Sequence, residues 1–233
     1  ALESADTIFR STKLSGIVVG HLDPLCSPYL ITDDITIPYN QFLQINPGVT
    51  IKINNGKSIQ VYGKLMVNGN NGDSVYFKNN SAFANINWGT IDFHKNSSDS
   101  SFIHNAVFKK TQGLYLRNDS VTISDNHFYS ASVNCSDSSN ANITGNVFIS
   151  YSTFTGQWAV YCYGHSRPTI FNNTFYTSSI YSYYANPVII NNNFMGQSYI
   201  QQQYHQVHLH SSEALVIDNY FQNNYGAVLI EYS

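Results

Sequence analysis

The segment Ile143-Thr-Gly-Asn-Val-Phe148 is one of six copies of a short pattern that recurs from residue 103 onward. In each copy an aliphatic residue precedes a Phe by five positions, and in five of the six an Asn precedes the Phe by two. The copies are Ile103–Phe108 (where Ala106 replaces the Asn), Ile123–Phe128, Ile143–Phe148, Ile170–Phe175, Ile189–Phe194 and Val216–Phe221. Successive Phe residues are 20, 20, 27, 19 and 27 positions apart. A repeat near 20 residues with occasional insertions predicts a solenoid.

The composition of these copies favours β-strands, because Ile, Val, Phe, Tyr, Thr, Ser and Asn outnumber the good helix formers. The offset of five between the aliphatic residue and the Phe is odd, so a straight strand would place the two on opposite faces. A bend between them would let both point inward. The Asn of each copy suits that bend, because Asn tolerates the left-handed conformation better than other non-glycine residues.

Stacking of equivalent positions from coil to coil predicts two internal columns. Asn side chains at one corner would bond to the coils above and below, and Phe side chains would fill the axis. The predicted Asn ladder consists of Asn126, Asn146, Asn173, Asn192 and Asn219, and the predicted Phe stack of Phe108, Phe128, Phe148, Phe175, Phe194 and Phe221.

An Asn ladder beside an aromatic stack resembles the right-handed parallel β-helix of the pectate-lyase-like superfamily. The stretch from Ser27 to Phe93 is similar to the first coils of secreted β-helix repeat proteins from prokaryotic cell surfaces. It includes Leu43-Gln-Ile-Asn-Pro-Gly-Val-Thr-Ile51 and Ile59-Gln-Val-Tyr-Gly-Lys-Leu-Met-Val67. The resemblance implies an all-β fold and says little about activity.

The length of 233 residues suits one solenoid of about ten coils, each rising roughly 4.8 Å. Residues 31–233 are expected to form this single domain. Residues 1–30 are expected to form an N-terminal cap or contact segment that leads into it.

Charged residues make up only 11% of the chain, and the net charge is -3. This balance excludes a strongly basic nucleic-acid surface, and the apolar runs are too short for a membrane span. The 18 Tyr suit surfaces that contact glycans or proteins, although Tyr also simply favours strands. The low charge and the abundance of Asn, Ser, Thr and Tyr are typical of exported β-solenoids, so an extracellular or cell-surface location is expected.

Six N-x-Ser/Thr sequons are candidate glycosylation sites if a glycosylating cell secretes the protein. They begin at Asn79, Asn96, Asn118, Asn134, Asn142 and Asn172.

Alignment of the coils places Cys135 beside Cys162 on adjacent coils. A separation of about 4.8 Å lies within the Cα range of a disulfide, although parallel neighbours make an awkward geometry for one. A pair of buried free thiols is the alternative. Cys26 is left over, either free or bridged to another subunit.

An enzyme of the pectate-lyase or polygalacturonase kind would gather carboxylates, often with Lys, Arg or Ca²⁺, on one face. The aligned positions around each Phe show no such cluster. Asp125 and Asp218 would lie four coils apart, roughly 19 Å. No catalytic residue is therefore assigned, and no cofactor is expected.

The densest titratable segment is Tyr204-His-Gln-Val-His-Leu-His210. On a strand, His208 and His210 would share a face, and Glu213 follows closely. Such a group could bind Zn²⁺ or Cu²⁺. A polar, partly exposed insertion is the alternative. The extra residues of the 27-residue coils fall at Gly156-Gln-Trp158 and Gln201-Gln-Gln203, where an aromatic and Gln-rich ridge would suit glycan or subunit contact.

The sequence closes on Val228-Leu-Ile-Glu-Tyr-Ser233, which reads as a strand and not as a polar cap. Because an open β-helix end exposes strand edges and apolar core, it is expected to pair with another subunit. The predicted function is a non-catalytic extracellular structural protein, a self-assembling subunit of a filament, sheath or surface layer. Its expected partners are copies of itself through the coil ends, with glycans as further ligands. The alternatives are a polysaccharide-active enzyme (lyase or glycoside hydrolase) and a monomeric carbohydrate-binding or adhesin module.

Overall fold

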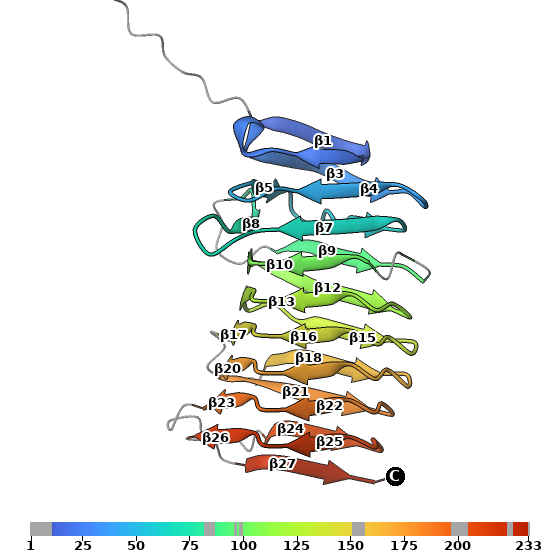
Figure 1. The fold of residues 1–233 in the computed structure, drawn as a ribbon, viewed down its shortest axis with the longest axis vertical. Helices are drawn as coiled ribbons and strands as arrows, with labels where there is room; N and C mark the ends of the chain where they lie inside the picture. Colours follow the sequence, from blue (N-terminus) through green and yellow to red (C-terminus); the bar gives the residue numbers. More distant parts are fainter. Residues whose placement is uncertain are drawn as a thin grey trace, which may run out of the picture.

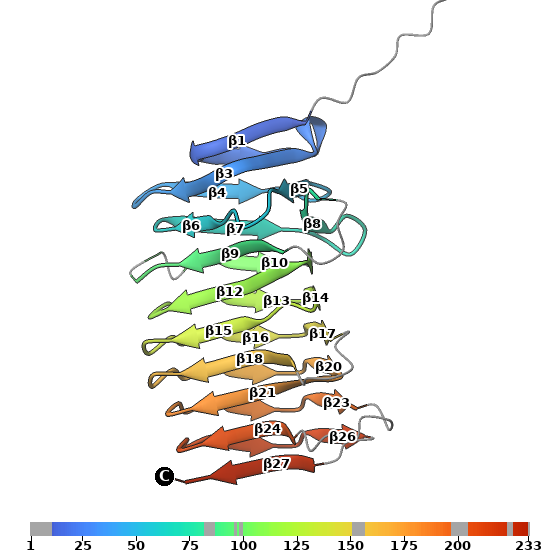
Figure 2. The same cartoon turned by 180° about the vertical axis from the view of Figure 1, so that it is seen from behind.

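A computed structural model describes residues 11–81, 87–95, 97, 100–150, 157–196, 205–222 and 226–232. This part of the chain forms β-strands and one short 3₁₀ helix, η1 (Pro24–Cys26). Figures 1 and 2 show the strands wound into coils that stack along one axis, from β1 at one end to β27 at the other. The chain is therefore an all-β solenoid, a parallel β-helix, as the repeat predicted.

Each coil contributes strands to three faces, and the first of these faces is a 9-stranded sheet. Its strands are β2 (Gly20–Leu22), β4 (Phe42–Ile45), β7 (Lys64–Asn68), β10 (Phe102–His104), β13 (Thr122–Ser124), β16 (Asn142–Thr144), β19 (Thr169–Phe171), β22 (Val188–Ile190) and β25 (Leu215–Ile217).

The other two faces belong to an 18-stranded sheet, in which each face is one row of parallel strands. The long strands β1 (Thr12–Ile17) and β3 (Tyr29–Ile37) run across both faces. The second face continues with β5 (Thr50–Ile53), β8 (Val75–Asn79), β11 (Ala106–Lys109), β14 (His127–Tyr129), β17 (Val147–Ile149), β20 (Thr174–Tyr176), β23 (Asn193–Met195) and β26 (Tyr220–Gln222). The third face continues with β6 (Ile59–Val61), β9 (Trp88–Phe93), β12 (Thr111–Arg117), β15 (Val133–Ser136), β18 (Gln157–Tyr163), β21 (Ser178–Tyr183), β24 (His205–His210) and β27 (Gly226–Glu231).

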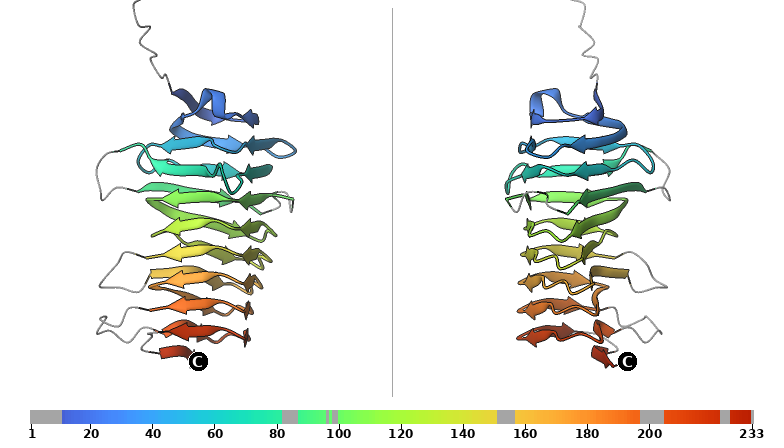
Figure 3. Two further views of the ribbon diagram at one scale, coloured as in Figure 1. Left: turned by 60° about the vertical axis from the view of Figure 1, so that its left-hand side comes forward. Right: turned by 90° about the vertical axis from the view of Figure 1, so that its right-hand side faces the viewer.

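Neighbouring strands on each face are parallel, and equivalent residues of successive coils lie opposite each other. Ile123 of β13 pairs with Ile143 of β16, and Phe128 of β14 pairs with Phe148 of β17. The side views in Figure 3 show the strands running across the long axis on every coil. Such a stack buries each coil only against its neighbours, which is the arrangement that a solenoid repeat requires.

The predicted Phe stack is confirmed and extends one coil further than expected. The rings of Phe77, Phe108, Phe128, Phe148, Phe175, Phe194 and Phe221 lie 4.7–5.0 Å apart between centroids, at interplanar angles of 4–9°. All except Phe221 are fully buried. Burial of rings this large is the main apolar contribution of the second face.

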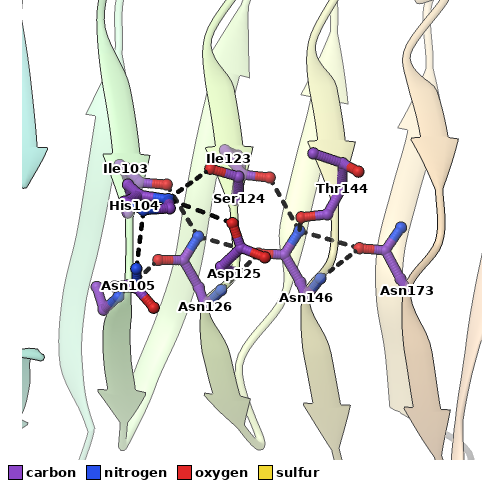
Figure 4. A network of polar contacts seen from close by, with 11 residues as sticks. Ile103, His104, Asn105, Ile123, Ser124, Asp125, Asn126, Thr144, Asn146 and Asn173 are labelled. Atoms are coloured by element: carbon purple, nitrogen blue, oxygen red, sulfur yellow. Dashed lines mark hydrogen bonds and ion pairs between the residues drawn. The ribbon is translucent and has the colours of Figure 1, made fainter. Parts of the chain in front are cut away.

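The predicted Asn ladder is also confirmed. Asn126, Asn146, Asn173 and Asn192 are buried, and each donates from Nδ2 to the side-chain oxygen of the next Asn at 2.9–3.0 Å, with Asn219 as the last acceptor. Figure 4 shows Asn126, Asn146 and Asn173 in line on three successive coils. The ladder satisfies backbone groups as well. The side-chain oxygens from Asn146 to Asn219 each also accept from the backbone N–H of the preceding Asn, and that of Asn126 accepts from the backbone N–H of Ala106.

The left-handed residue at this corner is not the ladder Asn, as the sequence had suggested, but the residue before it. That position has φ between +47° and +67° in all six copies, at Asn105, Asp125, Gly145, Asn172, Asn191 and Asp218. The turn of the backbone there swings the following Asn inward, where its amide meets the next coil. Asn, Asp and Gly are the residues that tolerate this conformation best.

The two aligned cysteines lie opposite each other, since Cys135 of β15 pairs with Cys162 of β18. Both are fully buried and both are free, so the candidate disulfide is not formed. Parallel neighbours point their side chains in the same direction, which is the awkward geometry that weighed against a bridge. Cys26 is free and exposed.

The N-terminal segment already belongs to the stack in its described part. β1 pairs with β3, and β2 pairs with β4, so residues from Thr12 onward add strands to both sheets. Among the described residues, no helix is long and apolar enough to cross a membrane.

Candidate functional site

The outer surface of the third face carries a group of aromatic and histidine side chains near the β27 end of the solenoid. We refer to it as the aromatic–histidine face. Its residues are Trp158, Tyr161, Tyr163, Tyr181, Tyr183, Tyr184, His208 and His210. The alternation from Val207 to His210 in β24 explains the outward position of the histidines: Val207 and Leu209 are buried in the core, so His208 and His210 point outward.

Register arranges these side chains in two columns that run along the axis. Tyr161, Tyr181 and His208 pair in succession across β18, β21 and β24. A parallel column holds Tyr163, Tyr183 and His210, and it ends on Glu231 of β27.

The rings of the first column pack against one another. Tyr161 and Tyr181 stack at 5.0 Å, and the ring of His208 meets Tyr181 edge-on at 4.8 Å. Trp158 lies 4.9 Å from Tyr181 and 5.8 Å from His208. Burial of the phenols raises the pKa of both Tyr161 and Tyr181, with neighbouring Tyr161 and Glu231 adding to the effect at Tyr181. The cluster is therefore a partly desolvated surface and not a set of independent exposed rings.

The two columns meet at one carboxylate at their β27 end. Oε2 of Glu231 accepts from Nε2 of His208 at 2.8 Å and lies 3.3 Å from Nδ1 of His210. These two hydrogen bonds lower the pKa of Glu231, and the one from His208 has the larger effect. The sequence had grouped the histidines with Glu213, but the carboxylate that joins them is Glu231, one coil further on. The signal was available, since Glu231 follows His210 by 21 residues, close to one repeat.

A second polar cluster lies at the Asn corner and appears in Figure 4. Nδ1 of His104 lies 2.9 Å from Oγ of Ser124 and 3.4 Å from Oδ2 of Asp125. A Ser-His-Asp triad needs the serine on one ring nitrogen and the acid on the other. Here both groups contact the same nitrogen, so the geometry is a surface hydrogen-bond network.

A surface cavity of about 370 Å³ lies at the corner between β3 and β4. Its lining consists of Tyr39, Asn40, Gln41, Phe42, Tyr62, Gly63 and Lys64. Tyr39 and Phe42 are exposed, and Tyr62 stacks flat on His94 at 4.1 Å and 2°. The repeat pattern does not predict this cavity, because its residues come from two coils that lack the Phe repeat.

The sequence pattern also does not predict a bidentate ion pair that joins β9 and β12. Arg117 of β12 donates from Nε and Nη2 to the two carboxylate oxygens of Asp92, each at 2.9 Å. The carboxylate raises the pKa of the guanidinium. Because Asp92 is buried on the neighbouring strand β9, the pair secures one coil to the next.

The remaining candidates lie at separate places on the surface. Among the sequons, Asn118, Asn142 and Asn172 are exposed, Asn79 and Asn134 are half-buried, and Asn96 lies outside the described residues. Glycosylation at these positions stays a prediction. Of the proposed ridge, Gly156 and Gln201–Gln203 lie outside the described residues. Gln157 and Trp158 begin β18, and Trp158 belongs to the aromatic–histidine face.

Comparison with protein-family models, with curated proteins and with solved structures returns no match. The class of the chain therefore rests on its own geometry. Parallel sheets wrapped around one axis, with a buried Phe stack and an Asn ladder, define a parallel β-helix repeat protein.

Proposed function

We propose that this chain is a non-catalytic extracellular structural protein whose copies stack end to end, as in a filament, sheath or surface layer. The Asn ladder and Phe stack support the further inference that its architecture is that of the pectate-lyase-like superfamily, of the secreted cell-surface kind. The composition, low in charge and rich in Asn, Ser, Thr and Tyr, supports the extracellular location.

The observation that carries the proposal is the apolar surface of the last described coil. Val228 and Ile230 of β27 occupy inward-facing positions, yet they are 37% and 51% exposed. Their partners one coil earlier, Val207 and Leu209, are 0% and 4% exposed. Covering such positions with another coil removes apolar surface from water and pairs the edge of β27 that no described strand covers.

The opposite end offers a complementary edge. β1 pairs with β3 on one side only within the described residues, and its inward-facing Leu14 is only half-buried. A head-to-tail contact of β27 of one copy with β1 of the next would continue the parallel sheet. Such a contact is heterologous, so it would propagate into a linear assembly.

The test uses one charged substitution at each end. Leu14→Lys blocks the β1 end, and Ile230→Lys blocks the β27 end. The parent should form filaments by electron microscopy and light scattering, whereas each variant alone should stay monomeric. An equimolar mixture of the two variants should form dimers that do not grow, because each variant retains one intact end.

Phe171→Glu provides the matched control, since Phe171 is 42% exposed on the lateral surface of β19. This variant should assemble like the parent. Circular dichroism checks that all variants retain their strands. A parent that stays monomeric at high concentration, or filaments that survive both end substitutions, would contradict end-to-end stacking.

A second candidate function is glycan binding at the Tyr39 cavity. Aromatic rings beside Asn40, Gln41 and Lys64 combine apolar area with hydrogen-bonding groups, which suits a saccharide. Screening on a glycan array should then reveal a ligand whose binding is lost in Tyr39→Ala. Tyr76→Ala, at a 43% exposed tyrosine of β8, should bind normally. A ligand that binds both variants equally would place its site elsewhere.

A further inference from the structure

His208, His210 and Glu231 present three ligand atoms that converge on one point outside the solenoid. The two imidazole nitrogens and the carboxylate oxygen all lie within 4.8 Å of one another. A tetrahedral ion with bonds of roughly 2.0–2.2 Å holds its ligand atoms roughly 3.3–3.6 Å apart. The contacts of 2.8 and 3.3 Å to Glu231 are close to that spacing. The three atoms spread over as much as 4.8 Å, so side-chain rotations that bring the two imidazole nitrogens closer together would complete the spacing that an ion needs.

We propose that these three residues bind a divalent transition-metal ion of the Zn²⁺ type, with a fourth coordination position open to water. Two imidazoles and one carboxylate suit Zn²⁺, Cu²⁺ and Ni²⁺, whereas Mg²⁺ and Ca²⁺ prefer oxygen ligands alone. This inference does not depend on the assembly proposed above, because all three ligands belong to one chain.

The surroundings hold the ligands in place. Tyr181 and Trp158 pack against the ring of His208, and Tyr183 packs against the ring of His210 at 5.0 Å. The side chains of His208 and His210 are only 18% and 26% exposed to solvent. Restricted rotation reduces the entropy lost on binding, and an aromatic shell limits the access of water.

The position in the fold gives the ion a structural consequence. The histidines lie on β24 and the carboxylate on β27, the last described strand of the solenoid. A bound ion would therefore join the last two strands of the third face and stabilise the folded state by mass action. The same atoms form a hydrogen-bonded His–Glu cluster without an ion, so the test must separate metal binding from a simple ion pair.

Isothermal titration of the chelator-treated protein with ZnCl₂ at neutral pH tests the proposal. We expect one ion per chain, no comparable binding of Mg²⁺ or Ca²⁺, and a rise in the melting midpoint with Zn²⁺. Co²⁺ in the same site should give the visible absorption of a tetrahedral complex. This spectrum reports on ligands directly and would not arise from a merely structural effect.

Three variants locate the ion. His208→Phe and His210→Phe keep an aromatic ring against the tyrosines but remove the nitrogen, and Glu231→Gln keeps the shape of the side chain. Each should weaken Zn²⁺ binding by about tenfold or more, since even the outer partners of metal ligands matter that much. Glu231→Gln leaves both histidine rings in place and is therefore the variant least disturbed in its folding.

His127→Phe is the matched control, because His127 is an exposed histidine of β14 outside the cluster. It should bind Zn²⁺ like the parent. Failure of the folded parent to bind Zn²⁺ would overturn the proposal. Unchanged affinity and an unchanged Co²⁺ spectrum in all three site variants would also overturn it, because the ion would then lie elsewhere.

Discussion

The side-chain oxygen of Asn146 accepts two hydrogen bonds from Asn126, one from its backbone N–H at 3.0 Å and one from its Nδ2 at 2.9 Å. Nδ2 of Asn146 in turn donates to Oδ1 of Asn173 and to the backbone oxygen of Ile123. One side chain thus satisfies polar groups of the coils before and after its own. The Asn corner is therefore a continuous hydrogen-bonded column along the solenoid.

Asn146→Ala should destabilise the protein because it leaves the buried donors of Asn126 without their acceptor. The expected loss is about 1–3 kcal/mol in the free energy of unfolding, the cost of a buried unsatisfied group. Urea unfolding measures it. Asn140→Ala, at an exposed position of the same region, should change stability by less than about 0.5 kcal/mol. Equal midpoints for the two variants would contradict a stabilising role for the ladder.

Phe148→Ala should cost more than the Asn substitution, because it opens a cavity between Phe128 and Phe175. The expected loss is about 3–5 kcal/mol, as for other fully buried Phe residues. Phe221→Ala, at the half-buried end of the stack, should cost clearly less in the same urea titration. Phe148→Leu, which refills most of the volume, serves as the control. Equal losses for Phe148→Ala and Phe221→Ala would show that burial along the stack is not what sets the cost.

The sequence predicts the two internal columns well because their period is visible without any structure. It misplaces the left-handed residue for an instructive reason. The positions before the ladder Asn include Asp125 and Asp218, which in the sequence are candidates for catalytic acids. Their composition of Asn, Asp and Gly is explained by backbone geometry, since all six copies have positive φ. At Gly145 an added Cβ would also approach Oδ1 of Asp125 to 2.4 Å.

The candidate site could be predicted only in part. Alternation places His208 and His210 on one face, whereas the choice of Glu231 depends on the pairing between β24 and β27. Glu213 lies nearer to the histidines in the chain, so the 21-residue offset from His210 to Glu231 identifies the right carboxylate only once the repeat length of about 20 is applied. Tyr161 and Tyr181, like Tyr163 and Tyr183, are one 20-residue repeat apart, so this part of the aromatic–histidine face left a detectable signal.

Thiol reactivity should differ sharply among the three cysteines. Burial raises the pKa of Cys135 to about 12 and that of Cys162 well above its ordinary value, so both remain protonated and shielded. Cys26 is exposed. In the native protein a disulfide-exchange reagent should therefore titrate one thiol rapidly, and Cys26→Ser should abolish that reaction.

Unfolding in denaturant without reductant should release all three thiols. The titration would then distinguish free cysteines from a Cys135–Cys162 bridge, which would leave a single reactive thiol. Rapid reaction of more than one thiol in the native protein would contradict the burial of this pair.

The exposed ion pair between Lys57 and Asp33, at 2.7 Å, should make a pH-dependent contribution to stability. The hydrogen bond from Lys57 lowers the pKa of Asp33 below its ordinary 3.8, and that to Asp33 raises the pKa of Lys57 above its ordinary 10.5. The contribution is therefore present between these two ordinary values. It is lost as the pH falls through the lowered pKa of Asp33, and as it rises through the raised pKa of Lys57.

A double-mutant cycle of Asp33→Asn and Lys57→Met isolates this contribution. The coupling between the two substitutions should be small at neutral pH, because both side chains are solvated, and should weaken further in high salt. At pH values well below the pKa of Asp33 it should vanish, since the carboxyl is then neutral in the folded and unfolded states alike. Thermal melts of the four proteins at neutral and acidic pH provide the comparison. A coupling that persists unchanged in acid would mean that the two side chains interact through packing rather than charge.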